Sequence, residues 1–156
     1  MTNHSHRSSA SFGKRQEYVV ISELLRKEFD VYMTLVDDQG IDCIIRLDPN
    51  HYLDIQIKAR SKTAKQWNFF GAMNIESREN YYFIFYIEKH NWLWVIPSYD
   101  VTKYARQNKT GDNIGKYSLS FPKSEESVNW NKFSDYFWEN GFELLRKFST
   151  ADPVAV

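Results

Sequence analysis

Two short segments of alternating apolar and polar residues, separated by a Pro-Asn turn, restrict the fold of this chain more than any other feature. They cover residues 41–47 (IDCIIRL) and 52–59 (YLDIQIKA). Such alternation predicts β-strands with one apolar and one polar face, because successive side chains of a strand point to opposite sides. The pair therefore predicts a β-hairpin whose apolar face packs in a core.

The polar faces of the two predicted strands carry chemically useful side chains. Asp42 lies on the polar face of the first strand, and Gln56 and Lys58 lie on that of the second. A carboxylate, an amide and an amine would thus share one side of the sheet. Asp54, on the same face as Gln56, is interpreted as a solvated residue or one that supports the others.

The hairpin register follows from the requirement that the two polar faces coincide. A three-residue loop, 49–51, pairs residues whose numbers sum to 100 and places Asp42 opposite Lys58. Such a loop needs one left-handed residue, which Asn50 tolerates. The alternative is an ordinary cross-strand ion pair on a solvated sheet face, worth less than about 1 kcal/mol.

Residues 11–29 predict a helix that begins after a Ser N-cap. At roughly 100° per residue, Glu17 falls between Ile21 and Leu24, in the apolar stripe that should pack on the sheet. A carboxylate on that face requires a partner. Either Glu17 turns toward the polar face of the hairpin, or it lies close enough to the helix end to reach water.

The rest of the chain predicts further strands and helices. A run that is apolar on both faces suits a central strand, and a second strand follows it as a hairpin that ends at a Pro. The expected elements are a central strand at 81–88, its hairpin partner at 92–96, a helix at 98–108 capped by Ser98, a strand at 115–121, and a terminal helix or helix pair at 129–148 broken near Gly141. This order predicts an α/β (α+β) fold, a mixed sheet with helices packed on it.

Composition favours one globular domain. The 20 basic and 20 acidic side chains cancel, which argues against coating nucleic acid through bulk charge, and Cys43 is the single cysteine, which favours a cytoplasmic setting. We expect a disordered basic tail at 1–10, whose two His could otherwise suggest metal binding, a domain at 11–150, and a tail at 151–156. Neither a secretory signal nor a membrane-spanning run is present in the sequence.

Charge is distributed unevenly around the hairpin. Residues 37–54 hold five Asp against one Arg, whereas 56–66 hold four cations and no acid. This order would suit an acidic metal pocket beside a basic phosphate-binding segment, although ordinary solvated charges are the alternative. The candidate nucleic-acid contacts are Arg60, Lys62, Lys14 and Arg15, and Trp67, Phe69 and Phe70 would either stack on bases or pack in the core.

These motifs resemble the PD-(D/E)XK nuclease superfamily. The resemblance covers about residues 11–60 and rests on "GKRQE", "DDQGID" and "LDIQIKAR". It is strongest for the branch in which Gln replaces the acidic residue before the lysine, as in Mrr-type restriction endonuclease domains and archaeal Holliday junction resolvases. The resemblance implies a restriction-endonuclease-like core with an active site of Glu17, Asp42, Gln56 and Lys58. Ile41 stands where many members have Pro.

The resemblance also implies a cofactor. Mg²⁺, or Mn²⁺ in its place, would be held by Asp42, Gln56, the backbone carbonyl of Ile57, and Glu17 directly or through a water. Oxygen donors of this kind suit such ions. Lys58 would orient the attacking water or stabilise charge on the phosphate.

The function implied is a metal-dependent DNA endonuclease of the defence or repair and recombination type. Its partner would be double-stranded or branched DNA, and a homodimer is compatible with this function. Because Gln56 removes one negative charge from the expected metal site, two alternatives stay open: a catalytically silent nucleic-acid-binding module, and a scaffold subunit with the same fold.

Overall fold

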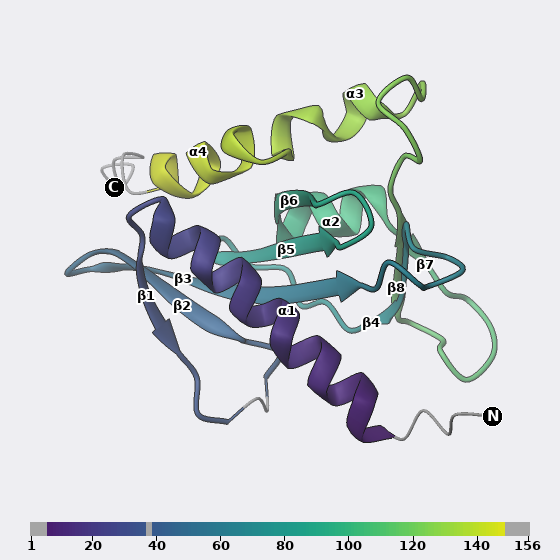
Figure 1. Ribbon diagram of the computed structural model, residues 1–156, viewed down its shortest axis with the longest axis horizontal. Helices are drawn as coiled ribbons and strands as arrows, with labels where there is room; N and C mark the ends of the chain where they lie inside the picture. The colour runs from purple at the N-terminus through teal and green to yellow at the C-terminus, as the bar shows by residue number, and fades with distance from the viewer. Residues whose placement is uncertain (1–5, 37–38, 149–156) are drawn as a thin grey trace.

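The computed structural model describes residues 6–36 and 39–148, which form two sheets with helices on both sides of the larger one (Figure 1). The strands of the larger sheet are, in spatial order, β1 (Asp30–Met33), β2 (Cys43–Asp48), β3 (His51–Arg60), β5 (Tyr81–Ile87) and β6 (Trp92–Pro97). Neighbouring strands are antiparallel except β3 and β5, which are parallel. The expected mixed sheet flanked by helices is confirmed.

The β2–β3 hairpin has the expected faces, but the expected register is wrong. Ile44 pairs with Asp54, so paired numbers sum to 98 instead of 100. The loop contains two residues because Asp48 pairs with His51, and a bulge at Leu47 then shifts the register by one more residue. This bulge restores the alternation that a two-residue loop alone would have reversed.

The central strand β5 is buried at every position, as its apolar sequence predicts. It forms the expected antiparallel hairpin with β6 and lies parallel to β3. The crossover from β3 to β5 contains β4 (Phe69–Met73), which the sequence did not predict. In the smaller sheet, β4 pairs with β8 (Tyr117–Ser120), which pairs in turn with β7 (Arg106–Gln107).

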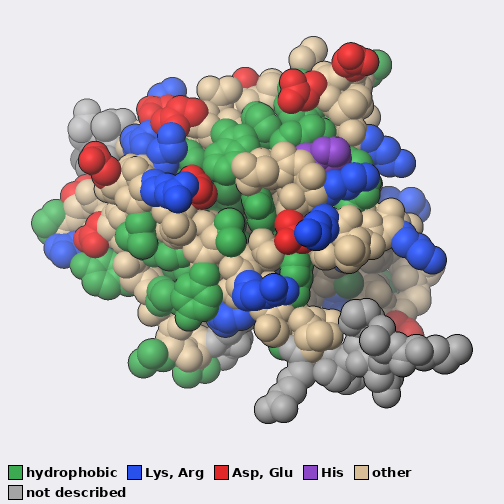
Figure 2. Space-filling model, viewed as in Figure 1, with side chains coloured by type: hydrophobic (Ala, Val, Ile, Leu, Met, Phe, Trp, Pro, Cys, Tyr) green, Lys and Arg blue, Asp and Glu red, His purple; other side chains and the backbone are tan. Residues whose placement is uncertain are grey.

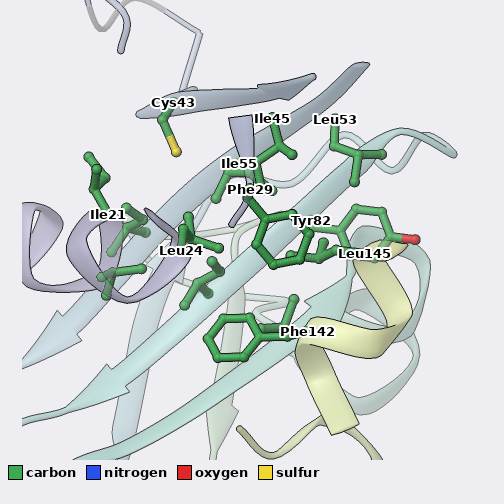
Figure 3. Packing of buried hydrophobic residues seen from close by; sticks show 14 of the residues in the cluster. Ile21, Leu24, Phe29, Cys43, Ile45, Leu53, Ile55, Tyr82, Phe142 and Leu145 are labelled. Carbon is green, nitrogen blue, oxygen red and sulfur yellow. The ribbon is translucent and has the colours of Figure 1, made fainter. Parts of the chain in front are cut away.

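Two helices cover one face of the larger sheet. Helix α1 (His6–Arg26) crosses in front of the sheet in Figure 1, and α4 (Glu139–Phe148) packs beside it. Residues 6–10, expected in a tail, are helical. Figure 3 shows the core between helices and sheet, which includes Ile21, Leu24, Phe29, Cys43, Ile45, Leu53, Ile55, Tyr82, Phe142 and Leu145. The apolar face predicted for the hairpin thus packs against α1 and α4.

The opposite face of the sheet is covered by the smaller sheet, α2 (Ser98–Tyr104) and α3 (Trp130–Phe133). Aromatic side chains dominate this second core: Phe83 stacks on Phe85 with ring centroids 5.8 Å apart, and Trp94 stacks on Phe121 at 4.4 Å. Phe70 of β4 contacts Phe85 edge to face. The smaller sheet is therefore attached to the larger one through aromatic packing.

The terminal segment is a helix pair, one of the two expected forms, but its break ends at Trp138 and Gly141 itself is helical. A 3₁₀ turn, η1 (Ser134–Tyr136), and a left-handed Trp138 (φ 42°) separate α3 from α4. Gly141 lies inside α4, where an added Cβ would come within 2.4 Å of the Tyr136 carbonyl oxygen and 2.9 Å of Val95 Cβ. Glycine at this position lets α4 approach β6 closely.

The sequence predicts that Ser98 caps α2, but its side chain forms no capping hydrogen bond with the helix. Its hydroxyl instead accepts the N–H of Arg78 at 3.0 Å and donates to the carbonyl of Arg78 at 2.9 Å. Helix α2 is also shorter than expected, because residues 106–107 belong to β7. Residues 1–5 and the tail expected from residue 151 lie outside the described part of the chain. Within that part, no helix is both long and apolar enough to cross a bilayer.

Candidate active site

Asp42 lies directly before β2, where its carboxylate accepts a backbone hydrogen bond from β3 that a strand carbonyl would otherwise accept. Its backbone N–H donates to the carbonyl of Ile55 at 2.8 Å, and its carboxylate Oδ2 accepts the N–H of Ile57 at 2.6 Å. Asp42 is only 9% exposed. This bond satisfies both a buried carboxylate and an N–H that β2 is too short to reach, so it fixes the carboxylate beside β3.

The carbonyl of Ile57 points to the same edge of β3 as the Asp42 carboxylate. The N–H of Asp54 donates to Asn80, on the β5 side, so the even-numbered residues of β3 direct their backbone groups toward β5. Odd-numbered residues direct theirs toward β2. Because β2 does not extend past the position opposite Ile55, the Ile57 carbonyl lies beyond the strand end, next to Asp42.

The observed register changes the expected neighbour of Asp42. The register ends at the Cys43–Ile55 pair, and the Asp42 N–H also bonds to Ile55, so Asp42 is not paired with Lys58 as predicted. A shift of two residues keeps every side chain on its face. Asp42 therefore contacts the backbone of β3 on both sides of Gln56, at Ile55 and Ile57. The side chains of Gln56 and Lys58 share the other face of β3 and line a cleft that Asp42 does not line.

Gln56 is held by a tyrosine that sequence reasoning missed. The Tyr81 hydroxyl lies 2.9 Å from Gln56 Oε1 and 3.0 Å from the carbonyl oxygen of Gly40. Gly40 has φ +68°, and an added Cβ would come within 2.9 Å of Gln56 Nε2. Only glycine combines that backbone conformation with so close an approach. Tyr81 thus ties the Gln56 amide to the segment that leads into Asp42.

Gln56 and Lys58 open into a cleft of about 700 Å³ bounded by β3, β4 and the segments that precede β2 and β5. Arg60, Arg78 and Tyr81 also line it. Figure 2, which views the α1 side, shows basic and acidic side chains interspersed over that face, as zero net charge would suggest. The cleft lies on the other side of the sheet from α1.

Glu17 faces inward on α1, but not at the centre of its buried stripe. Its side chain is 17% exposed and forms an ion pair with Lys14. The carboxylates of Asp42 and Glu17 both add to the effect of burial, which raises the pKa of the Cys43 thiol to about 12. They also help to raise the pKa of Lys14. Both carboxylates therefore lie within electrostatic range of Cys43 and Lys14.

The four predicted nucleic-acid contacts occupy different environments. Arg60 lines the cleft, where its Nε donates to the carbonyl of Phe69 at 2.5 Å and burial lowers its pKa. Lys62 is exposed, with its backbone N–H bound to Glu88. Lys14 and Arg15 are exposed on α1, away from the cleft.

Arg78 was the other important residue missed by sequence reasoning. It lies in the irregular segment between β4 and β5, where no periodic pattern assigns a side chain to a face. Its guanidinium forms a salt bridge to Asp54 at 2.6 Å and lies 4.2 Å from the centroid of the Tyr81 ring. The polar character of Asp54 was the signal that could have suggested a cationic partner on this face.

The candidate metal ligands are few. Among the described residues, no group of three or more His, Cys, Asp or Glu side chains is placed to hold a metal ion. The Asp42 carboxylate and the Ile57 backbone lie together at the end of β2. The Gln56 amide opens into the cleft and Glu17 pairs with Lys14 on α1. Asp37 and Asp38, part of the predicted acidic segment, lie outside the described residues.

Comparison with known proteins bears on the fold. No protein-family model matches the sequence, and no curated protein matches it. A solved structure does match: a bacterial homing endonuclease, I-Ssp6803I, with a TM-score of 0.65 over 90% of this chain and 94% of that one. The chain has a nuclease-like fold. Because the two sequences are only 15% identical, this similarity concerns the fold alone, that is, the arrangement of the helices and strands.

Proposed function

We propose that this protein is a metal-dependent DNA endonuclease of the PD-(D/E)XK type, with Gln56 at the position of the usual second acidic residue. The observation that carries the proposal is the hydrogen bond from the Ile57 N–H to Asp42, which fixes a carboxylate at the backbone between Gln56 and Lys58. The similarity to a structure described as a homing endonuclease supports the same activity.

The donor set fits a hard divalent cation. Asp42, Gln56 and the Ile57 carbonyl offer only oxygen atoms, which suits Mg²⁺ or Mn²⁺ better than a metal that prefers sulfur or nitrogen. We propose that these three groups hold the ion, with Glu17 contributing directly or through a water. When bound, such an ion supplies Lewis acidity at the phosphate and toward the attacking water.

The protein's own residues would perform the remaining tasks. The ammonium of Lys58 donates hydrogen bonds to the attacking water or to a non-bridging phosphate oxygen, where it stabilises developing negative charge. Tyr81 holds the Gln56 amide in a fixed orientation. The Ile57 N–H holds the Asp42 carboxylate in place before DNA arrives, so that little reorganisation is needed during the reaction.

A nucleic-acid-binding module without catalytic activity is the second candidate. The neutral Gln56 favours it, since the described residues near the strand edge then supply two carboxylates, Asp42 and Glu17, and metal affinity falls with the missing charge. Such a module would use the same cleft to bind DNA without cutting it.

The experiment that separates these functions is a cleavage screen. Purified protein is incubated with supercoiled, linear, branched and single-stranded DNA in Mg²⁺, in Mn²⁺, and in a chelator. Lys58→Ala protein, purified in parallel, controls for contaminating nucleases. Cleavage that needs the metal and Lys58 supports the endonuclease. DNA binding without cleavage by wild type favours the silent module, and neither activity favours the scaffold subunit.

The biological setting belongs to the same proposal. The resemblance points to defence or to repair and recombination, in the cytoplasm, and the substrate is double-stranded or branched DNA. A homodimer would allow both strands of a duplex to be cut, which sedimentation of the protein with and without DNA would test.

A further inference from the structure

Arg78 forms part of the cleft wall without belonging to the proposed catalytic group. It lies on the loop before β5 and lines the same cleft as Gln56 and Lys58. Its side chain is 38% exposed. The residue is therefore accessible to a ligand that enters the cleft.

Three separate contacts hold Arg78 in place. Its Nη2 donates to the Asp54 carboxylate at 2.6 Å, and the guanidinium packs on the ring of Tyr81 at 4.2 Å. Its backbone N–H and carbonyl both bond to the hydroxyl of Ser98, which is fully buried. An arginine held at both backbone and side chain loses little conformational entropy when it binds a ligand.

The guanidinium keeps donors for a ligand. It carries five N–H groups in a planar fork, and within the described part of the chain its one side-chain hydrogen bond is to Asp54. The charged side chains lining the cleft are the cations Lys58, Arg60 and Arg78 against the single carboxylate Glu76. This excess favours an anionic ligand.

We propose that Arg78 is a phosphate-binding residue that contacts the DNA backbone away from the reacting phosphate. The inference rests on the proposed function of the cleft. Asp54, which holds Arg78, precedes Lys58 by four residues of β3, or about 13 Å at the usual strand rise. A DNA strand carries a phosphate about every 3.4 Å along the helix axis. Because Arg78 is held at Asp54 and not at Lys58, the proposal assigns it a different phosphate from the one that Lys58 contacts, so that Arg78 sets the position of the strand in the cleft.

The test is the salt dependence of DNA binding, measured in a chelator so that cleavage plays no part. Fluorescence anisotropy with a short labelled duplex gives the affinity over a series of salt concentrations. Arg78→Gln should weaken binding by about tenfold at low salt and reduce the slope of log K against log salt by about 0.9, the loss of one phosphate contact. Arg78→Lys should keep the slope and recover only part of the affinity, because lysine lacks the fork.

Two control variants isolate the contact. Arg26→Gln removes one exposed cation from α1, on the other side of the sheet, and should leave the slope unchanged. The double variant Asp54→Asn/Arg78→Gln removes the carboxylate that Arg78→Gln would leave unpaired. It should still show the reduced slope if Arg78 contacts phosphate, and a wild-type slope would overturn the proposal.

Other outcomes separate this inference from the proposed function. An unchanged slope in Arg78→Gln, with a lowered melting temperature, means a structural role and overturns the inference while the endonuclease stands. A reduced slope in a protein that never cleaves DNA supports the phosphate contact and removes the endonuclease. Absence of DNA binding by wild type overturns the inference.

Discussion

The carboxylate of Asp42 accepts the backbone N–H of Ile57 at 2.6 Å, and this bond joins the loop before β2 to the strand that carries Gln56 and Lys58. The bond holds the Asp42 carboxylate in place, and it also gives the Ile57 N–H a partner where β2 no longer pairs with β3. The proposed function and the stability of the fold therefore depend on the same carboxylate. Substitutions that keep or remove the acceptor oxygen can separate the two.

Asp42→Asn should keep the fold, whereas Asp42→Ala should not keep its full stability. Asn retains an oxygen that can accept the Ile57 N–H, but Ala leaves that buried donor without a partner, at a cost of about 1–3 kcal/mol. Both variants should lose divalent-cation binding. Urea unfolding and calorimetric titration measure the two properties, and wild-type cation affinity in Asp42→Asn would remove Asp42 from the metal site.

Gln56→Glu should tighten Mg²⁺ or Mn²⁺ binding in the absence of DNA, because it adds a carboxylate of nearly the same shape. Each tenfold gain in affinity corresponds to about 1.4 kcal/mol. Without metal the variant should melt at a lower temperature, since the new charge is close to Asp42. Equal affinity and equal metal-dependent stabilisation in the two proteins would favour the silent module.

Gly40→Ala should disturb the candidate site, and Gly111→Ala provides a matched control. Both glycines have positive φ, +68° and +79°, so alanine costs each about 1–2 kcal/mol in backbone strain. Only at Gly40 would the new Cβ press on Gln56 Nε2, whereas nothing lies within 4 Å at Gly111. Cation affinity should fall in Gly40→Ala alone. An equal loss in both variants would mean that Gln56 orientation does not matter.

Asp48 should make hairpin stability depend on pH. The backbone N–H of Asn50 and the side chain of His51 lower the pKa of Asp48 below its ordinary 3.8. A lowered carboxyl pKa contributes stability that is present above the unfolded value and lost as pH falls through the folded value. The gap in unfolding free energy between wild type and Asp48→Asn should thus shrink from about pH 7 to about pH 2. A gap that stays constant would exclude this linkage.

The faces of the hairpin could be predicted from the sequence because strand alternation alone decides them. Leu53, Ile55 and Ile57 are buried against the helices, as their positions required. The register could not be predicted in the same way. It depends on the bulge at Leu47, and a bulge of this kind has no residue signature in the segment.

The helix illustrates a second limit. Regular 100° spacing places Glu17 between Ile21 and Leu24 and would also include Leu25 in that stripe, yet Leu25 is 55% exposed and Gln16 is buried. The sheet contacts a face rotated toward Gln16, which a helical wheel cannot detect when a polar residue fills a buried position. Whether the Glu17 carboxylate comes within water-bridging distance of Asp42 stays a prediction.

The residues that complete the cleft could not be predicted at all. Tyr81 belongs to a strand that is apolar on both faces, so its hydroxyl gives no sign of reaching Gln56 and Gly40. Arg78 lies in a segment without periodicity, and its partner Asp54 is 24 residues away. Such contacts depend on the parallel pairing of β3 with β5, a feature of topology and not of local sequence.

Cleavage of supercoiled DNA by wild type, Lys58→Ala and Asp42→Asn, in Mg²⁺ and in chelator, tests whether Asp42 and Lys58 form a metal-dependent nuclease site. We expect nicking by wild type only when the metal is present. We expect loss of nicking of at least about a hundredfold in each variant, a typical effect of removing one transition-state contact, with DNA binding and melting temperature preserved in Lys58→Ala. Wild-type cleavage by either variant would contradict the assignment of this site.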